Sequence, residues 1–224
     1  QFRNRAALLR SRIARENRRE TIEAFGPGPH KVLFTLILPN LPNERFEFIM
    51  EMAPIDLMPH TVHTFLQQVH HKLWDGCTFV FCAEHILQAS PMPSDLNPHA
   101  DLRQPFYENS LDKVYFQEYS QEYPHVTNTV GISGRPGGPD FYINLVDNTD
   151  NHGPGGQIDN ILKEEADPCF GKIISGLDVI EKMKNLPTTD YEFDIFVHIE
   201  SARIMGSSLK AEDYLKGNPT MPTK

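Results

Sequence analysis

The chain has 224 residues, of which 39% are apolar, so it can bury the core of one medium-sized domain but not of two full domains. No apolar run approaches the roughly 20 residues that a membrane-spanning helix needs. The net charge of −9 is uneven, because residues 1–25 hold seven Arg and three Glu (+4) and the remaining residues therefore carry −13. An acidic body argues against nucleic-acid binding by that part of the chain.

The first residue and the cysteines bear on membrane association and on the redox compartment of the protein. The sequence begins with Gln1 rather than Met, which indicates a processed or truncated start and leaves open membrane association through a removed N-terminal segment. Cys77 and Cys82 lie five residues apart, and a regular strand would point them to opposite faces. We therefore expect no disulfide between these two, and with Cys169 the count is odd and defines no redox compartment.

Residues 2–24 have the pattern of a helix with a narrow apolar seam and many arginines. The seam consists of Phe2, Ala6, Leu9 and Ile13, at alternating spacings of four and three residues. It is too thin for a core helix. One interpretation is an arm that docks onto a larger assembly or onto an acidic membrane surface. The other is a solvated, charge-rich helix or linker. The Gly-Pro-Gly-Pro run at 26–29 ends it.

A hairpin and a helix are predicted to open the main domain. Residues 32–38 are apolar and β-branched, residues 45–52 alternate, and the link between them contains Pro and Asn, which predicts two antiparallel strands. Pro59 suits the first turn of a helix. Helical spacing after Pro59 predicts a core face made of Val62, Phe65, Leu66, Val69 and Leu73.

Four histidines, His60, His63, His70 and His71, fall off this core face, and we expect them to be solvated. They include no i, i+4 pair, and neither an acidic nor a cysteine ligand is supplied nearby in the sequence, so no metal site is predicted. The strand that follows alternates Phe79 and Phe81 on one side with Val80 and Cys82 on the other, as in a strand covered on both faces.

The second half of the chain predicts loops that alternate with short strands. Residues 91–112 are rich in Pro, Asn and Asp and predict a long surface excursion. The Gly-rich segment 134–139 lacks phosphate-binding spacing and is interpreted as a plain connection. Strands are predicted over 130–133, 140–146, 170–174 and 195–204, and a helix over 177–183 that buries Leu177, Ile180 and Met183.

These elements predict a mainly β fold. Eight or so strands with antiparallel links and two core helices indicate a closed eight-stranded antiparallel β-barrel capped by two α-helices, with an extra N-terminal helix. We divide the chain into an Arg-rich arm over 1–25, a domain over 26–206 and a polar tail over 207–224.

Four motifs in this domain resemble those of the cyclophilins, a family of peptidyl-prolyl cis-trans isomerases built on such a barrel. Residues 59–65 (PHTVHTF) resemble P-x-T-V-x-N-F, and residues 74–79 (WDGCTF) resemble Y-[DK]-G-x-x-F. Residues 139–143 (PDFYI) are similar to S-Q-F-F-I, and residues 170–180 (FGKIISGLDVI) to F-G-x-V-x-x-G-x-D-V-V. Their order and separation fit the family across roughly residues 30–205.

The resemblance implies a reaction, but the residue on which that reaction depends is missing. Rotation about an X-Pro bond crosses a barrier of roughly 18–20 kcal/mol. The family lowers it with an arginine that favours the pyramidal prolyl nitrogen of the transition state. Phe81 occupies the arginine's position, or Val80 if the alignment slides by one residue. The sequence therefore assigns no catalytic residue.

Other groove positions implied by the resemblance also differ from the family. Asp140 replaces a glutamine, Ile132-Ser133-Gly134 replaces M-A-N, Asp167 replaces a histidine, and the only tryptophan is Trp74, outside the groove. Leu87 is retained as an apolar floor, Gln88 as a polar end and Tyr142 as a wall. The implied substrate-binding residues are Phe81, Leu87, Gln88, Gly134, Asp140 and Tyr142, with no metal and no cofactor.

Three hypotheses for function follow. In the first, the domain is a binding or scaffold module with weak or absent isomerase activity, which protein partners hold in a larger assembly through the arm and the long excursion. Proline-containing peptides are a further expected ligand of its groove. In the second, it is a working isomerase that assists protein folding, and Arg103 or Arg135 reaches the groove. The third is an unrelated activity on the same fold. A guanidinium within hydrogen-bond reach of the groove separates the first two.

Overall fold

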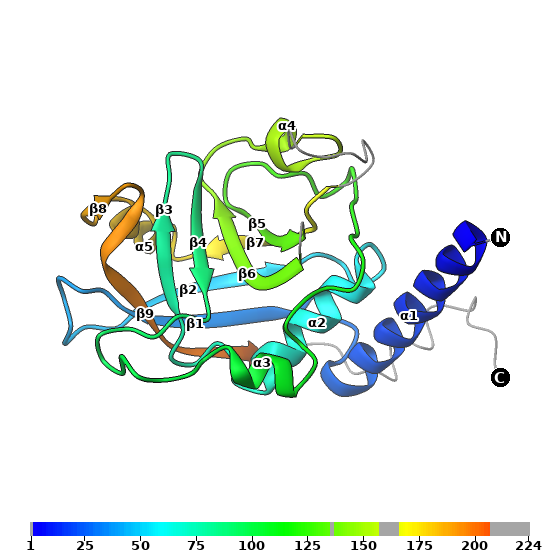
Figure 1. The fold of residues 1–224 in the computed structure, drawn as a ribbon, viewed down its shortest axis with the longest axis horizontal. Helices are drawn as coiled ribbons and strands as arrows, with labels where there is room; N and C mark the ends of the chain where they lie inside the picture. Colours follow the sequence, from blue (N-terminus) through cyan, green and yellow to red (C-terminus); the bar gives the residue numbers. More distant parts are fainter. Residues whose placement is uncertain (1, 135–136, 157–165, 207–224) are drawn as a thin grey trace.

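The strands of the chain close into a barrel in the computed structural model, which describes residues 2–134, 137–156 and 166–206 (Figure 1). The strands are β1 (Lys31–Ile37), β2 (Phe46–Met52), β3 (Thr78–Cys82), β4 (Ile86–Ser90), β5 (Thr129–Gly134), β6 (Gly137–Asn144), β7 (Cys169–Ser175), β8 (Thr188–Thr189) and β9 (Glu192–Met205). The order β1-β2-β7-β5-β6-β4-β3-β9 returns to β1 through a β1–β9 pairing, and β8 extends β9 as a short hairpin. This confirms the predicted closed eight-stranded antiparallel barrel.

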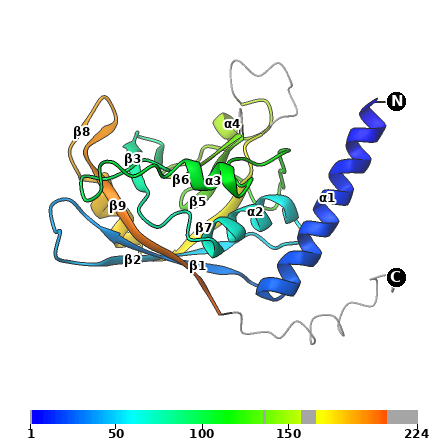
Figure 2. The same ribbon diagram turned by 60° about the horizontal axis from the view of Figure 1, so that its bottom comes forward.

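In the part of the chain that the structure describes, five helices accompany the barrel. They are α1 (Phe2–Phe25), α2 (Pro59–His70), α3 (Gln104–Glu108), α4 (Thr149–His152) and α5 (Leu177–Lys184). Helices α2 and α5 pack on the barrel core, whereas α3 and α4 are single turns within loops. In both Figure 1 and Figure 2, α1 runs away from the barrel and only its C-terminal end lies near α2. Within the described residues, no helix is long and apolar enough to cross a bilayer.

The predicted hairpin supplies the centre of the core. Its strands are displaced by only one residue from the predicted bounds, and the register places Phe34 opposite Phe48. Their rings stack with centroids 4.8 Å apart. Both side chains are fully buried, and each such burial stabilises the fold by roughly 1.5–3 kcal/mol. Alternation along the two strands therefore accounts for the core that the barrel encloses.

A bulge in β3 changes the predicted alternation of that strand. The pairing of β3 with both of its neighbours shifts register between Phe79 and Phe81. Phe79 lies in the barrel core, whereas Phe81 packs outside the barrel against a second, small apolar cluster. The expectation that these two phenylalanines share one face is therefore wrong, because the residue added by the bulge reverses the faces of those that follow.

The same bulge affects the cysteines. Cys77 lies in the core and Cys82 packs against it, so the expected placement on opposite faces is also wrong. Both are nevertheless free thiols, as is Cys169. Burial raises the pKa of Cys77 and raises that of Cys169 to about 12, which keeps these two thiols protonated and unreactive at neutral pH.

Helix α2 is covered on more sides than the sequence predicted. All five predicted core residues are buried, although the helix ends at His70 and Leu73 follows in a turn. His70 and His71 are exposed as expected, but His60 and His63 are buried. His60 and His63 are buried because other segments of the chain cover the side of α2 that faces away from the barrel. No cluster of potential metal ligands occurs within the described ranges.

His63 faces the end of α1. Its Nδ1 lies 2.9 Å from Thr21 Oγ1, and its Nε2 lies 3.6 Å from a carboxylate oxygen of Glu20. Arg18 also pairs with Asp56, just before α2, and Thr21 and Ile22 are buried. The last two turns of α1 therefore pack onto the domain.

Two other expectations need correction. Leu177 is 45% exposed, and the buried stripe of α5 is instead Val179, Ile180 and Met183. Leu177 is the first residue of this helix, so it lies at the edge of the contact with the barrel. The excursion over 91–112 is not wholly on the surface, because Phe106 of α3 is buried edge-on against Trp74 with ring centroids 5.3 Å apart. The predicted tail over 207–224 lies outside the described residues.

Glu118, in the acidic segment after the excursion, caps α2. The N-terminal position Met58 offers no side-chain acceptor. The Glu118 carboxylate instead accepts hydrogen bonds from the backbone N–H groups of His60 (3.0 Å) and Thr61 (2.8 Å), and from the Thr61 hydroxyl (2.9 Å). These are donors that the first turn of a helix leaves unsatisfied, and an anion there also meets the positive end of the helix dipole.

We predict that Glu118→Ala lowers the free energy of unfolding by about 1–2 kcal/mol, the usual cost of removing a helix cap. Exposed Glu122 in the same segment is the matched control, and Glu122→Ala should change stability by less than about 0.5 kcal/mol. Urea denaturation of the two variants measures the difference. Equal effects would show that the cap does not stabilise α2.

The buried His60 gives a pH prediction. Burial, followed by the charge of His63, lowers its pKa to about 4, and its Nε2 accepts a hydrogen bond from the Tyr115 N–H (2.9 Å). Because this folded pKa lies below that of the unfolded chain, the contribution to stability is complete above about pH 6.5 and falls as the pH drops toward 4, by at most about 1.4 kcal/mol per pH unit. An NMR titration of the ring should give a midpoint below 5; a midpoint near 6.5 would contradict this.

Candidate functional site

The candidate site lies on the outer face of the barrel across β3, β4 and β6. The strand register pairs Phe81 with Gln88 and Gln88 with Tyr142, so these three residues form one row across three strands. Side chains paired in this way in antiparallel strands share a face. Phe81 and Tyr142 also belong to an outer cluster with Ala83 and Ile86, which is separate from the barrel core. The bulge in β3 is what brings Phe81 into this row.

The apolar floor of the site differs from the prediction. Leu87 is fully buried in the barrel core, on the opposite face of β4 from Gln88. The residue that faces the outer cluster is Ile86, two positions before Gln88. Leu87 is therefore wrong as a groove residue, and the period-two alternation of a strand would have selected Ile86 once Gln88 was placed outward.

Tyr142 forms the wall of the site and is held firmly. It is 3% exposed, and its ring lies over Gly131 of β5, where a Cβ would come 2.5 Å from Tyr142 Oη. Its hydroxyl donates to Asp167 Oδ2 at 3.1 Å, and its ring lies 4.6 Å from that of His152 between centroids. A side chain with these contacts has a fixed position rather than adapting to a ligand.

Asp167, which stands where the resemblance implies a histidine, anchors this wall from beneath. Its Oδ2 also lies 3.0 Å from His152 Nδ1, and its backbone oxygen lies 2.9 Å from His125 Nε2. Its backbone N–H donates to the His152 carbonyl at 2.9 Å. The Asp167 carboxylate therefore connects β6 and α4, and its backbone oxygen adds the loop before β5, so this residue is a structural anchor rather than a groove ligand.

Two asparagines extend this network under the β4 end of the site. Asn144 donates to the Thr129 hydroxyl (3.0 Å) and carbonyl (3.2 Å), and Asn148 donates to Asn144 Oδ1 (2.8 Å) and to the carbonyl of His85 (2.9 Å). Burial lowers the pKa of His85, the charge of His152 lowers it further, and Glu84 opposes both. With its pKa lowered in this way, the His85 imidazole is neutral at neutral pH.

Asp140 marks the other end of the site on β6. Burial raises the pKa of its carboxyl group, while the charge of Arg103 and the hydroxyl of Ser90 oppose that shift. Its Oδ1 is buried without a hydrogen-bond partner among the described residues. A buried acceptor of this kind is costly unless a ligand or water completes it. Asp140 thus has an acceptor that a ligand or water could complete.

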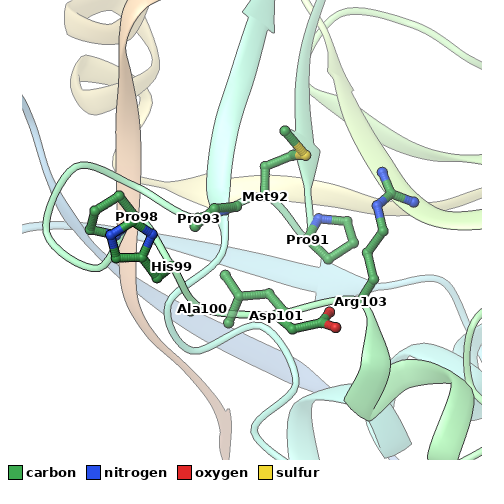
Figure 3. Close-up of a pocket in the computed structure, with 9 residues that line it drawn as sticks. Pro91, Met92, Pro93, Pro98, His99, Ala100, Asp101 and Arg103 are labelled. Atoms are coloured by element: carbon green, nitrogen blue, oxygen red, sulfur yellow. The ribbon is translucent and has the colours of Figure 1, made fainter.

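Arg103 is the only one of the two candidate arginines that falls within the described residues, since Arg135 lies outside them. It is exposed at the rim of a shallow hollow of about 320 Å³ lined by residues 91–93 and 98–103. Figure 3 shows its side chain rising beside Pro91, away from Pro98 and His99. Across the described chain it forms no ion pair with Asp140, although its charge influences that carboxyl group.

Gly134 lies at the end of the β5–β6 hairpin, where it pairs with Gly137. It flanks the two residues at 135–136 that are not described, and it is not part of the row of Phe81, Gln88 and Tyr142. The row itself carries no cation, so it offers apolar surface and an amide to a ligand but no charge for a developing lone pair.

Several residues of the site were missed in the sequence. Strand alternation could have found Ile86, as noted above. His125 and His152 lie in turn-rich segments without periodicity, and Asn144 and Asn148 carry no motif. Only the closure of the barrel brings these four residues under Tyr142, so no local signal could have selected them.

Comparison with known proteins gives a consistent result. Residues 45–204 match the family model for cyclophilin type peptidyl-prolyl cis-trans isomerase/CLD. A crystal structure of a Cryptosporidium parvum cyclophilin type peptidyl-prolyl cis-trans isomerase is 12% identical, with a TM-score of 0.53, over 80% of this chain and 99% of that chain. The same type of protein, crystallised with the dipeptide Ala-Pro, is 13% identical, with a TM-score of 0.51, over 78% and 99%. These structures support the fold alone. Comparison with curated proteins gives no match.

The contact between Gly131 and Tyr142 generates a prediction about the wall. Gly131→Ala should lower the free energy of unfolding by about 1–3 kcal/mol, because the new methyl group must displace the tightly held Tyr142 ring. Gly138→Ala, in the same hairpin, is the control, since a Cβ there meets nothing closer than 3.9 Å. Guanidinium denaturation compares the two. A harmless Gly131→Ala would show that the wall is mobile.

Proposed function

Because the chain belongs to the cyclophilin type peptidyl-prolyl cis-trans isomerase family, we propose that it is a binding module that uses this fold to hold proline-containing segments with weak or absent isomerase activity. We further propose that it is a subunit of a larger assembly, attached through α1. Family membership and the barrel support a binding site for proline-containing segments. The residues of that site support binding with weak or absent isomerase activity.

Phe81 is the observation that carries this proposal. The resemblance implies that the family has its catalytic arginine at this position, and the bulge in β3 puts Phe81 in the outer row, where it packs against the cluster of Ala83, Ile86 and Tyr142. Its ring also lies 5.9 Å from that of Tyr191 between centroids. A phenylalanine with these apolar neighbours adds binding surface for a prolyl ring, but it cannot donate to the prolyl nitrogen at the top of the rotational barrier.

The expected loss of rate is large. Removing a single preorganised donor from a transition-state site typically costs about 10²–10³ in rate, or about 2.7–4 kcal/mol. Apolar contacts with Phe81 and Tyr142 act equally on the planar and twisted amide, so they favour binding without lowering the barrier. Weak turnover together with retained binding is therefore the behaviour that this groove supports.

A working isomerase is the second candidate, and Arg103 favours it. Its guanidinium is the described cation whose charge acts on Asp140 at the end of the groove. Two observations weigh against it. Arg103 is exposed, so water competes for its donors, and the Asp140 carboxylate is a stronger attraction than a neutral prolyl nitrogen.

We predict that the full chain accelerates cis-trans exchange of an Ala-Pro peptide at least about 100-fold less than typical family members, as measured by exchange NMR. Phe81→Arg should restore only part of the rate, because the new guanidinium pairs with Asp140. Arg103→Ala should leave the residual rate unchanged. A wild-type rate typical of the family would contradict the proposal, and its loss in Arg103→Ala would assign the reaction to Arg103.

A further inference from the structure

The first half of α1 is exposed, and its described contact with the domain is Arg10, whose Cζ lies 6.0 Å from the centroid of the Phe116 ring. Every residue from 2 to 12 is exposed, and Phe2 and Leu9 are 86% and 59% exposed. Figures 1 and 2 both show this half projecting beyond the barrel. An isolated helix of this length is marginal in water, because few residues share the cost of nucleation. Among the described residues, no segment of the chain buries Phe2 or Leu9.

Three exposed apolar residues of this half and the half-buried Ile13 follow a heptad, whereas exposed Leu8 lies outside it. Phe2, Ala6, Leu9 and Ile13 are separated by four, three and four residues, which is the alternation of d and a positions in a coiled coil. A strict a/d stripe of this kind is narrower than the face of a helix that packs on a globular core. The seam therefore matches a single partner helix rather than a broad surface.

Arginines occupy every position that flanks this seam. With Phe2 and Leu9 at d, the e positions are Arg3 and Arg10 and the g positions are Arg5 and Arg12. Residues 2–15 contain five arginines in all, with no acidic residue and no lysine. Charges at e and g determine which helix can pair, because they meet the e and g side chains of the partner.

The seam ends where α1 meets the domain. Its next two positions are Glu16 and Glu20, which cannot continue an apolar stripe. From there the helix buries Thr21 and Ile22 instead, on a face roughly a third of a turn away from the seam. The two halves thus use different faces, so docking onto α2 leaves the seam open.

We propose that the first half of α1, residues 2–13, pairs with an acidic helix of a partner protein in a short heteromeric coiled coil. The partner helix has apolar residues at a and d and Glu or Asp at e and g. This inference rests on the proposal that α1 attaches the chain to an assembly, and it specifies the chemistry of the attachment.

Other occupants fit these residues less well. A second copy of the chain would place four arginines against four arginines, and like charges at e and g oppose pairing. An anionic bilayer favours a wider apolar face than a seam that includes Ala6. Arginine, by contrast, forms two parallel hydrogen bonds with a carboxylate, which is the geometry that a Glu at e or g offers.

The test uses the full chain and a defined probe. The probe is a fluorescent synthetic helix with Ile at a, Leu at d and Glu at e and g, and binding is measured by anisotropy. The same peptide with Lys at e and g and phosphatidylserine-containing vesicles are the alternatives. We expect saturable 1:1 binding of the Glu peptide and none of the Lys peptide. Preferential binding to vesicles would overturn the proposal in favour of a membrane surface, and self-association in place of probe binding would also overturn it.

Matched variants distinguish peptide binding through the coiled-coil seam from binding by general charge attraction. Leu9→Glu, in the seam, and Arg12→Glu, at g, should each weaken binding about tenfold or more. Leu8→Glu and Arg15→Glu change similarly exposed residues outside those positions and should weaken it less than about threefold. Equal effects within either pair would overturn the coiled coil. Unchanged thermal unfolding in all four variants confirms that the barrel is intact.

Deleting residues 1–13 distinguishes this inference from the proposal on which it rests. If the deletion leaves the chain in its natural assembly on gel filtration, both are wrong. If it releases the chain but the Glu peptide does not bind, α1 attaches the chain by other chemistry and only the coiled coil is wrong. Release together with position-specific peptide binding supports both.

Discussion

The bulge between Phe79 and Phe81 decides which side chains of β3 face the barrel core and which face the groove. Without the added residue, Phe81 would point into the core beside Phe79, and the outer face would lose the apolar end of its row. Backbone geometry, and not residue type alone, therefore places Phe81 in the outer row with Gln88 and Tyr142.

The rest of the groove is rigid for reasons that do not involve catalysis. Tyr142 lies on Gly131 and donates to Asp167, and Asp167 is held in turn by His152. A buried carboxylate with such partners is costly to disturb, because removing one partner leaves a desolvated acceptor. The wall is therefore preformed, and a preformed wall reduces the entropy that a ligand loses on binding.

The sequence predicted the barrel well because its signals are local: alternation in β1 and β2, helical spacing in α2 and the four motifs. It failed where tertiary contacts override those signals. His60 and His63 are buried because the segment around Glu118 and the end of α1 cover α2, and neither contact has a local signature. Leu87 was assigned to the groove together with Gln88, although the alternation of β4 places these neighbours on opposite faces. The helix and seam of α1 were recognisable, but its division into a docked half and an exposed half required the structure.

The central claim is that the groove binds proline-containing segments without a catalytic charge. The most direct test is a titration of the isotope-labelled full chain with a proline-containing peptide, followed through backbone amide shifts. The account predicts saturable shifts at Gln88, Tyr142 and Phe81, with the largest changes along that row and little change at the far side of the barrel in β1 and β2. Saturable binding that leaves the row unshifted, or no binding at all, would contradict it.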